Sequence, residues 1–317
     1  MLEAPVLGQG QKCSPASDQH DHPVIDTSRA NAARVWNHWL GGKDNYPIDQ
    51  EFGEQVCALA PGIIDVARAG RGFLLRAVRH LTDAAGIRQF LDIGTGLPTV
   101  THTHQVAQAI APACRIVYVD NDPLVLAHAR ALLTSSPQGS TDHLQADLRD
   151  PDTILQQAAR TLDFTQPIAL LLLEILNFIL DDDQALAIVN RLLDALPEGS
   201  YLLLSHSTAE IHHEAMLQYT QLWNDHATPP ITTRSFQQLT PFFNHLELLE
   251  PGVVPCSLWR PDPCQIGNPV AVDAFCGVGR KLTTARGSHC ASRPGSTGAT
   301  GVGFGQDRRA TSACWWE

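Results

Sequence analysis

Four apolar segments of the chain each end in an acidic residue, and these acidic residues recur at almost constant intervals. They are Asp92, Asp120, Asp147 and Glu174, separated by 28, 27 and 27 residues. An interval of this size accommodates about one strand, one helix and their connections. Repeated strand–helix units form a parallel sheet, and the carboxyl ends of its strands open at one edge, where ligands bind. The spacing therefore predicts four carboxylates gathered at a single sheet edge.

The surrounding pattern predicts an α/β fold in which helices cover both faces of the sheet. Short, nearly continuous apolar strands are typical of parallel sheets that are buried on both sides. We expect strands at about residues 89–93, 115–119, 143–146, 168–173 and 201–205. We expect helices at about residues 28–40, 63–81, 99–111, 123–133, 151–162 and 183–195. Pro123 and Pro151 each follow an acidic residue, an order that starts a helix with a cap and then a proline.

The first strand runs into the turn Asp92-Ile93-Gly94-Thr95-Gly96, whose glycines let the backbone pass close to a ligand. A dinucleotide-binding loop would carry a third glycine three residues after the second, and Thr99 occupies that position. Asp92 would repel a pyrophosphate, whereas it would attract a sulfonium or an ammonium group. The loop, with Asp92, Gly94, Thr95 and Gly96 as binding candidates, therefore favours S-adenosyl-L-methionine (SAM) over NAD.

The next two strand ends supply further candidates for binding the same cofactor. Asp120 can accept hydrogen bonds from both ribose hydroxyls, as an acidic residue does in other nucleoside-binding sheets of this type. Asn121 beside it is another candidate, although Asn121 or Asp122 can also cap the following helix. Asp147 can accept from the adenine amino group while Leu148 offers its backbone N–H. The alternative for Asp147 is an ordinary turn residue.

Two N-terminal segments carry polar groups that the strand pattern does not explain. Residues 40–46 read Leu-Gly-Gly-Lys-Asp-Asn-Tyr, and we hypothesise that Asp44 and Asn45 fold over the open sheet edge to contact the donor or the acceptor. The alternative is a plain helix stop followed by a turn. On the helix at 63–81, four arginines lie opposite the apolar face: Arg68, Arg71, Arg76 and Arg79. Such a row is typical of a solvated surface, and a phosphate- or substrate-binding face is the alternative.

These motifs resemble the class I methyltransferases and, more narrowly, a bacterial family named S-adenosyl methyltransferase, formerly a domain of unknown function. The resemblance is carried by residues 40–46, 89–99, 117–130, 145–151, 205–208 and 257–261, spread over about residues 25–281. It implies a Rossmann-like, seven-stranded, mostly parallel sheet and SAM as the methyl donor, and it does not supply the acceptor. Pro98 departs from the third glycine of the usual class I loop. Asn177 stands where the family tends to carry a histidine, which puts proton transfer at that position in doubt.

Methyl transfer from a sulfonium is an in-line displacement in which alignment of the reacting atoms lowers much of the barrier. A general base is needed only for an unactivated hydroxyl or a protonated amine. The candidates at the strand ends are Glu174 and His206, with a structural role as the alternative for each. No Asn/Asp-Pro-Pro-Tyr motif follows the fourth strand, which argues against methylation of nucleic-acid amino groups. We therefore expect an unidentified small-molecule acceptor, roofed by a helix pair within residues 211–243.

Charge and composition narrow the range of possible partners and cellular locations. The 317-residue chain has a net charge of −11, which argues against a nucleic-acid partner. Residues 1–22 lack the basic start and apolar core of a signal peptide, and the longest apolar run is too short to cross a membrane. The eight cysteines include no CxxC pair, so the sequence indicates no metal site and a cytoplasmic location. Nothing in the sequence indicates the oligomeric state.

The composition along the chain predicts three regions. Residues 1–24 are expected to be a flexible leader, and residues 25–281 a methyltransferase domain with a helical cap (25–85) and a Rossmann-like core (86–281). In residues 282–317, 20 of 36 are Gly, Ser, Thr or Ala, so we expect a disordered tail. Two other functions stay open. A non-catalytic SAM-binding regulatory protein is favoured by Asn177, and an NAD-dependent oxidoreductase is disfavoured by Asp92 and Thr99.

Overall fold

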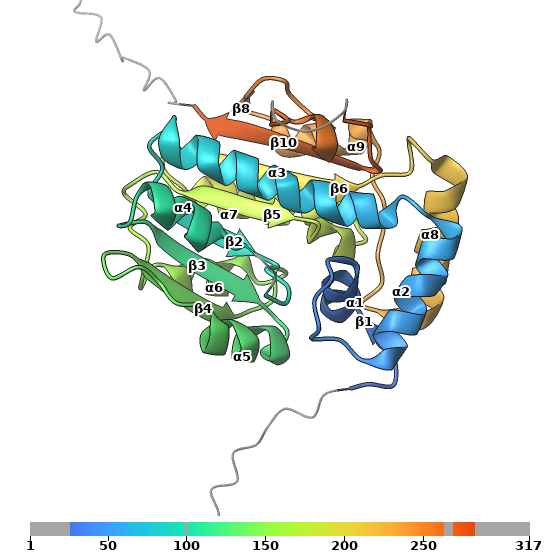
Figure 1. Ribbon diagram of the computed structural model, residues 1–317. Helices are drawn as coiled ribbons and strands as arrows, with labels where there is room; N and C mark the ends of the chain where they lie inside the picture. The colour runs from blue at the N-terminus through green and yellow to red at the C-terminus, as the bar shows by residue number, and fades with distance from the viewer. Residues whose placement is uncertain (1–25, 99–100, 263–268, 283–317) are drawn as a thin grey trace, which may run out of the picture. The chain divides into compact units, whose positions relative to one another are not determined.

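Alternate residues of the central strands face opposite sides of the sheet and bury their side chains in two separate cores. In the first strand, Phe90 belongs to one core and Leu91 to the other. The same alternation separates Ile116 from Val117 in the next strand. This burial on both faces explains the nearly continuous apolar pattern of the strands. The computed structural model describes residues 26–98, 101–262 and 269–282 (Figure 1).

The main sheet has the strand order β4-β3-β2-β5-β6-β10-β8, with β9 paired to β10. Neighbouring strands from β4 to β6 are parallel, whereas β10 is antiparallel to β6, β8 and β9. The bounds are β2 Gln89–Ile93, β3 Arg115–Asp120, β4 Ser140–Gln145, β5 Ala169–Leu173, β6 Tyr201–Ser207, β8 Leu246–Leu248, β9 Val254–Pro255 and β10 Ala274–Lys281. The predicted Rossmann-like α/β fold is confirmed. The sheet has eight strands instead of seven, because the short β9 adds to β10.

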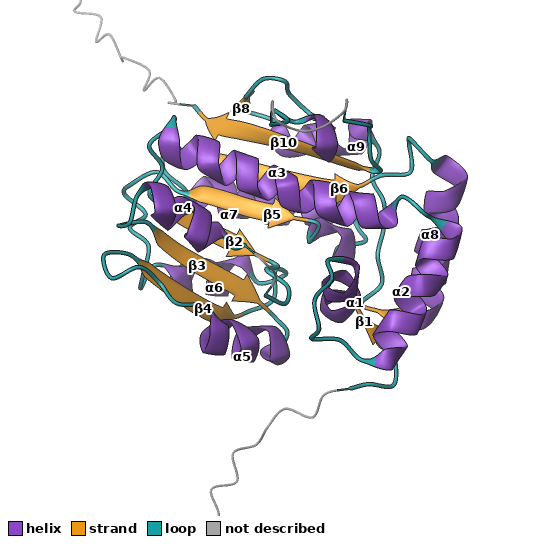
Figure 2. Cartoon of the chain, viewed as in Figure 1, coloured by secondary structure: helices purple, strands orange, loops and turns teal. Residues whose placement is uncertain are grey.

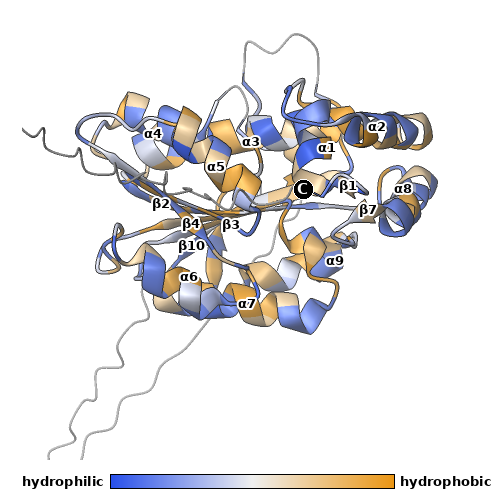
Figure 3. Ribbon diagram, turned by 90° about the horizontal axis from the view of Figure 1, so that it is seen from below, coloured by the Kyte–Doolittle hydropathy of each residue, from blue (hydrophilic) through white to orange (hydrophobic). Residues whose placement is uncertain are grey.

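Helices cover both faces of this sheet, as Figures 2 and 3 show. One face is covered by α3 (Ile63–Asp83), α4 (Thr103–Ile110) and α5 (Pro123–Leu132). The other face is covered by α6 (Pro151–Ala158), α7 (Asp182–Ala195) and α9 (Phe236–Leu239). The side chains of Asp122 and Asp150 accept hydrogen bonds from the first turns of α5 and α6, so the predicted caps are confirmed.

A smaller group of elements lies beyond the carboxyl ends of β5 and β6 (Figure 1). It contains α1 (Ala32–Trp39), α2 (Pro47–Leu59), α8 (His213–His226) and a parallel pair of short strands, β1 (Ala30–Asn31) and β7 (Ala227–Thr228). Five aromatic side chains pack together in it: Trp36, Trp39, Phe52, Tyr219 and Trp223. We call this group the cap. It brings the N-terminal segment to the ligand-binding edge of the sheet.

The structure differs from the sequence-based expectation mainly at element boundaries and in the cap. The first helix begins at Ala32, because the Asn31 side chain accepts hydrogen bonds from the backbone N–H groups of Ala33 and Arg34. The helix α2 was not predicted. Within residues 211–243, α8 is a full helix, but α9 has only four residues and continues into a 3-10 helix, η2 (Thr240–Phe243).

Two further 3-10 helices complete the structure: η1 (Leu176–Phe178) and η3 (Cys256–Leu258). The expected leader, 1–24, and residues 283–317 of the expected tail lie outside the described residues.

Candidate functional site

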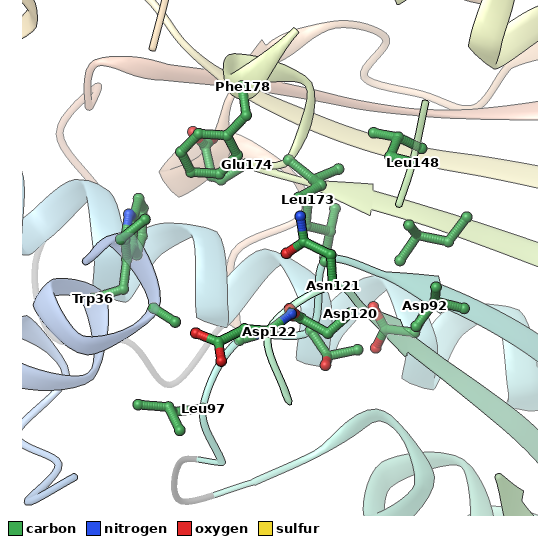
Figure 4. Close-up of a pocket in the computed structure, with 18 of the residues that line it drawn as sticks. Trp36, Asp92, Leu97, Asp120, Asn121, Asp122, Leu148, Leu173, Glu174 and Phe178 are labelled. Atoms are coloured by element: carbon green, nitrogen blue, oxygen red, sulfur yellow. The ribbon is translucent and has the colours of Figure 1, made fainter. Parts of the chain in front are cut away.

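A cavity of about 240 Å³ opens at the carboxyl ends of the parallel strands. Its walls come from the loops after β2, β3, β4 and β5, and from α1 of the cap and α3. Figure 4 shows Asp92, Asp120 and Glu174 among the residues that line it. Asp147 lines the same cavity, so the structure brings together all four carboxylates predicted from the strand spacing.

The loop after β2 approaches the neighbouring chain segments closely enough to require glycine. Gly94 has a φ of +80°, and its N–H donates to the carbonyl of Val119. A Cβ on Gly94 would lie 2.5 Å from the side chain of Ile175. Gly96 has a φ of +63°, but a Cβ there would meet no atom within 4 Å. The backbone beside Gly96 therefore borders open space into which a ligand can fit.

Asp120 is fixed at the end of β3 by two backbone groups. Its carboxylate accepts from the N–H of Gly96 at 3.0 Å and from the N–H of Asp122 at 3.0 Å. Burial raises the pKa of Asp120 to about 6, although these N–H donors oppose the shift. Asn121, beside it, is exposed and also lines the cavity.

Asp92 is buried beside the same loop. Its carboxylate accepts from the hydroxyl of Thr103 at 2.6 Å. Burial raises the pKa of Asp92 to about 6, and the Thr103 hydrogen bond and the charge of Arg71 partly oppose that shift. Ionisation of Asp92 and Asp120 is thus costly without a ligand, and a cation in the cavity would stabilise their charged forms.

The loop after β4 contributes one apolar and one charged group. Leu148 is buried, whereas Asp147 is half-exposed and interacts with Arg149 at 3.4 Å. Arg149 also donates to the carbonyl of Phe178 at 2.8 Å, which ties this loop to the segment that follows β5. Thr95, the remaining candidate of the glycine loop, lines the cavity as well.

Glu174 follows β5 with a φ of +52°, a left-handed conformation that is uncommon for a residue with a side chain. One carboxylate oxygen, Oε2, accepts from Ser207 Oγ at 2.7 Å and from Asn177 Nδ2 at 2.8 Å. The other, Oε1, is buried, and among the described residues only the Ser205 hydroxyl remains as a side-chain partner for it. Burial raises the pKa of Glu174, and the hydrogen bonds from Ser207 and Asn177 partly offset this effect.

His206, the second catalytic candidate, does not line the cavity. It is fully buried, with Nδ1 2.8 Å from the carbonyl of Ser207 and Nε2 2.7 Å from Nη1 of Arg234. Burial, followed by the charge of Arg234, lowers the pKa of His206 to about 3. The ring is therefore neutral, and its one lone pair accepts from Arg234. This arrangement suits the structural alternative for His206 and leaves no nitrogen free for an acceptor.

Arg234 is a buried residue that the sequence analysis missed. Its guanidinium donates to the carbonyls of Leu176 and Ile179 at 2.9 and 2.7 Å and pairs with Asp182 at 2.8 Å. It thereby holds the segment around η1, which carries Asn177 and follows Glu174. No motif signals this role, because the contact joins residues more than 50 positions apart.

Asp44 and Asn45 do not line the cavity either. The N–H of Asp44 and the side-chain amide of Asn45 both donate to Oδ1 of Asn37, at 3.0 and 2.8 Å. Asn37 itself is buried and lines the cavity. Asp44 also lies 3.7 Å from His128 of α5. The segment thus reaches the site indirectly, through Asn37.

The four arginines of α3 do not share one environment. Arg68 and Arg79 are exposed, whereas Arg76 donates to the carbonyls of Trp259 and Cys256 at 2.9 and 2.8 Å. Arg71 lines the cavity, donates to the carbonyl of Thr101, and has a buried Nε that finds no partner among the described residues. A solvated surface therefore describes only part of the row. Arg71 is a site residue that helical periodicity did not distinguish from its neighbours.

The lining fits a ligand with positive charge and one carboxylate. Among the described lining residues, five are acidic, namely Asp92, Asp120, Asp122, Asp147 and Glu174. Only two are arginines, Arg71 and Arg149. SAM carries a sulfonium, an ammonium and a carboxylate, so this set of side chains matches it better than the pyrophosphate of a dinucleotide.

Neither a metal-binding cluster nor a membrane-spanning helix is found among the described residues. No group of three or more His, Cys, Asp or Glu residues is placed to hold a metal ion in that part of the chain. Within the same part, none of the helices combines the length and the apolar character that a membrane span needs.

Comparison with known proteins gives a family and a set of related structures. The family model described as S-adenosyl methyltransferase matches residues 18–282. A DUF574 family protein from Streptomyces avermitilis MA-4680 is 42% identical, with a TM-score of 0.77 over 81% of this chain and 99% of that chain. A protein from Thermobifida fusca YX assigned as a methyltransferase is 38% identical, with a TM-score of 0.75 over 82% and 98%.

Curated relatives are more distant. A carboxy-S-adenosyl-L-methionine synthase from Citrifermentans bemidjiense is 25% identical over 53% of this chain and 69% of its own. The protein of the same name from Trichlorobacter lovleyi is 28% identical over 56% of this chain and 69% of its own.

Proposed function

Because this chain belongs to the S-adenosyl methyltransferase family, whose donor is SAM, we propose that it methylates a small-molecule acceptor bound in the cavity at the sheet edge. The observation that carries the proposal is the acidic lining of that cavity beside the glycine loop. When bound, SAM supplies an electrophilic methyl carbon attached to a positively charged sulfur.

We assign the donor contacts from the positions of the side chains. We assign Asp120 to the ribose hydroxyls, as their acceptor, and Asp147 and Leu148 to the adenine. Gly96 leaves room for the ligand beside the backbone, Gly94 and Thr95 are assigned to the same loop contact, and Asp92 favours the positive charge of the ligand. Asn121 lines the adenosyl side of the cavity.

Arg71 completes this assignment as the anchor for the donor's carboxylate. Arg71 lines the cavity, its charge acts on Asp92, and its Nε, which has no partner among the described residues, leaves a donor available. Arginine recognises carboxylates through charge-assisted hydrogen bonds. Asp44 and Asn45 act in this proposal by positioning Asn37, and His206 acts by holding the segment after β5 through Arg234.

Asn177 does not prevent catalysis in this proposal. Its amide fixes Oε2 of Glu174, so it orients a carboxylate that can itself exchange a proton. The chemistry that the family's histidine would supply is therefore assigned to Glu174. A protein that binds SAM without turnover would lack a reason to hold this carboxylate against the cavity.

Isothermal titration calorimetry tests the donor assignment. We expect binding of SAM and of its demethylated product, S-adenosylhomocysteine (SAH), and no binding of NAD. Arg71→Met should weaken SAM binding at least about 10-fold, since a hydrogen bond to a charged group contributes about 1.5–3 kcal/mol to the binding free energy. Arg68→Met is the matched control, because Arg68 lies on the same helix and is exposed. Binding of NAD in preference to SAM, or no heat with SAM at millimolar concentration, would contradict the proposal.

A further inference from the structure

The cavity contains a polar pair that the donor contacts leave unused. Glu174 Oε1 and Ser205 Oγ are both buried and belong to lining residues, and in the described part of the chain they have no side-chain partner other than each other, the Ser205 hydroxyl helping to lower the pKa of Glu174. Buried polar atoms are rarely left unpaired, because an unmet hydrogen bond destabilises the folded chain. This pair therefore points to a ligand group that donates hydrogen bonds.

The direction of the free carboxylate oxygen is fixed by the chain. Ser207 and Asn177 both bind Oε2, and Asn177 is held in turn by its own backbone carbonyl, which accepts from the N–H of Thr232 at 2.9 Å. The positive φ of Glu174 costs backbone energy, which the surrounding hydrogen bonds must outweigh. Beyond the Ser205 hydroxyl, Oε1 is thus left able to accept a further hydrogen bond.

The strand order separates this pair from the adenosyl contacts. Asp92 lies in β2, Asp120 ends β3 and Asp147 follows β4, and these strands form one side of the sheet edge. Glu174 follows β5, and Ser205 lies on β6, so both lie on the other side of β2. The donor's adenosine occupies the first side in our assignment. The second side is left for the acceptor.

Aromatic side chains accompany the pair. Trp36 of α1 and Phe178 of η1 line the same cavity, and Figure 4 draws them with Glu174 toward one end, away from Asp92. Aromatic rings attract cations through their electron-rich faces, and they also pack against flat apolar groups. This end of the cavity therefore combines a free carboxylate oxygen, a hydroxyl and two aromatic rings.

We propose that Glu174 and Ser205 form the head-group site of the methyl acceptor, and that the acceptor is a primary or secondary amine bound as its ammonium ion. This inference rests on the proposed function and names its substrate class. An alcohol would leave the buried carboxylate without a counter-charge, and a carboxylic acid would be repelled by it. An ammonium satisfies Glu174 Oε1 and Ser205 Oγ together.

The contact between the ammonium and Glu174 also accounts for the proton that the nitrogen must lose before it is methylated. The ammonium passes one proton to Glu174, and the nitrogen lone pair that this frees forms the new N–C bond. The electrons of the broken C–S bond leave with sulfur as a neutral thioether, so positive charge moves to the methylated nitrogen. Glu174 then returns its proton to solvent.

The test compares three probes that differ only in the head group: benzylamine, benzyl alcohol and benzoate. Each is titrated at neutral pH into the full chain saturated with SAH. We expect benzylamine to bind at least about 10-fold more tightly than either of the others. SAH binding by itself tests the proposed function, so a protein that binds SAH without preferring the amine overturns only the present inference.

Variants assign the preference to the residues. Glu174→Gln should weaken benzylamine binding at least about 10-fold and leave the affinity for SAH unchanged. Ser205→Ala, which removes a hydroxyl whose only described side-chain partner is Glu174, should fold normally and weaken benzylamine binding to a smaller extent. Glu54→Gln, on the exposed side of α2, is the control and should change neither affinity. If Glu174→Gln weakens SAH and spares benzylamine, the carboxylate serves the donor and the inference is overturned.

Discussion

At the scale of single residues, the site depends on side chains held in costly states. Asp92 and Asp120 are buried carboxylates, Glu174 has a left-handed backbone, and Gly94 and Gly96 provide conformations that other residues adopt poorly. Such costs accumulate at functional sites, because the geometry that stabilises a ligand is seldom the most stable geometry for the free chain. Binding of a cationic ligand would remove part of the cost.

Gly96 and Gly86 provide a matched pair for testing the loop. Both have a positive φ, +63° and +71°, and a Cβ on either would meet nothing within 4 Å. Alanine at each position should therefore lower the free energy of unfolding by a similar amount, about 1–2 kcal/mol. Only Gly96 lines the cavity, so Gly96→Ala should also weaken SAM at least about 10-fold in calorimetry, while Gly86→Ala should not. Equal SAM affinities in the two variants would show that the ligand does not approach this loop.

The raised pKa values of Asp92 and Asp120, both about 6 against an ordinary value of 3.8, predict a pH dependence. At pH values between 3.8 and about 6, Asp92 and Asp120 hold protons in the folded chain that they release in the unfolded chain. The contribution of these two groups to the free energy of unfolding therefore falls as the pH rises through this range. A cation in the cavity favours the ionised carboxylates and lowers both pKa values. We therefore expect SAM affinity to decrease as pH falls through about 6, with proton release on binding near that pH.

Calorimetry in buffers of different ionisation enthalpy measures this proton release. Asp92→Asn should release fewer protons than the unchanged chain, because one of the two titrating groups is gone. Proton uptake on binding, or an affinity that stays constant from about pH 5 to 7, would rule out the charge-based account of donor recognition.

At the scale of elements, apolar periodicity predicted α3 and the central strands well but did not predict α2. In α2, the only buried apolar side chains are Phe52 and Val56, too few to give a recognisable stripe. β10 was also not predicted from its residues, because Gly277 interrupts the apolar run. A Cβ on Gly277 would lie 2.8 Å from the Phe243 ring, so packing excludes a larger residue there. The formation of α2 and of β10 therefore depends on contacts between segments that are distant in the sequence.

The same limit applies to the candidate site. The carboxylates at the strand ends could be placed from spacing alone, because parallel strands must present their carboxyl ends together. The environment of Arg71 could not be predicted, since the sequence of a helix face does not show whether that face borders solvent or a cavity. The neutral state of His206 also could not be predicted, because it depends on its complete burial and then on Arg234, 28 residues away.

Within the cap, one buried carboxylate connects several backbone segments. Asp49 accepts from the N–H groups of Asn31 and Tyr46, and it pairs with Arg34 at 2.7 Å with both side chains almost fully buried. Asp49→Ala would leave the Arg34 charge buried without a partner, at a cost of about 3–5 kcal/mol. We expect hydrogen exchange to become faster in residues 30–59 and to stay slow in β2 to β6.

The exposed Glu51, two residues away on α2, gives the control. Glu51→Ala should leave both exchange and stability close to those of the unchanged chain. If Asp49→Ala accelerates exchange uniformly, the cap and the sheet unfold as one unit. If it accelerates none, the ion pair contributes little.

At the scale of the whole described structure, the C-terminal strand is central to the sheet. β10 lies between β6 and β8, so it joins the last β-strands to the parallel half. Its last residue, Lys281, donates from Nζ to the carbonyls of Leu193 and Leu196 at the end of α7, both at 2.8 Å. The family match ends at residue 282, next to this lysine. The folding unit that we propose for residues 25–281 therefore includes β10 as an essential part.

Two truncations test that boundary. A chain ending at residue 282 should keep the melting temperature and SAM affinity of the full chain, because every strand of the sheet and the Lys281 contacts remain. A chain ending at residue 273 lacks β10, which exposes the edge of β6 and leaves β8 and β9 unpaired. It should fail to unfold cooperatively when heated, as monitored by circular dichroism. If the longer truncation product also loses SAM binding, residues 283–317 contribute to the site and the proposed boundary is wrong.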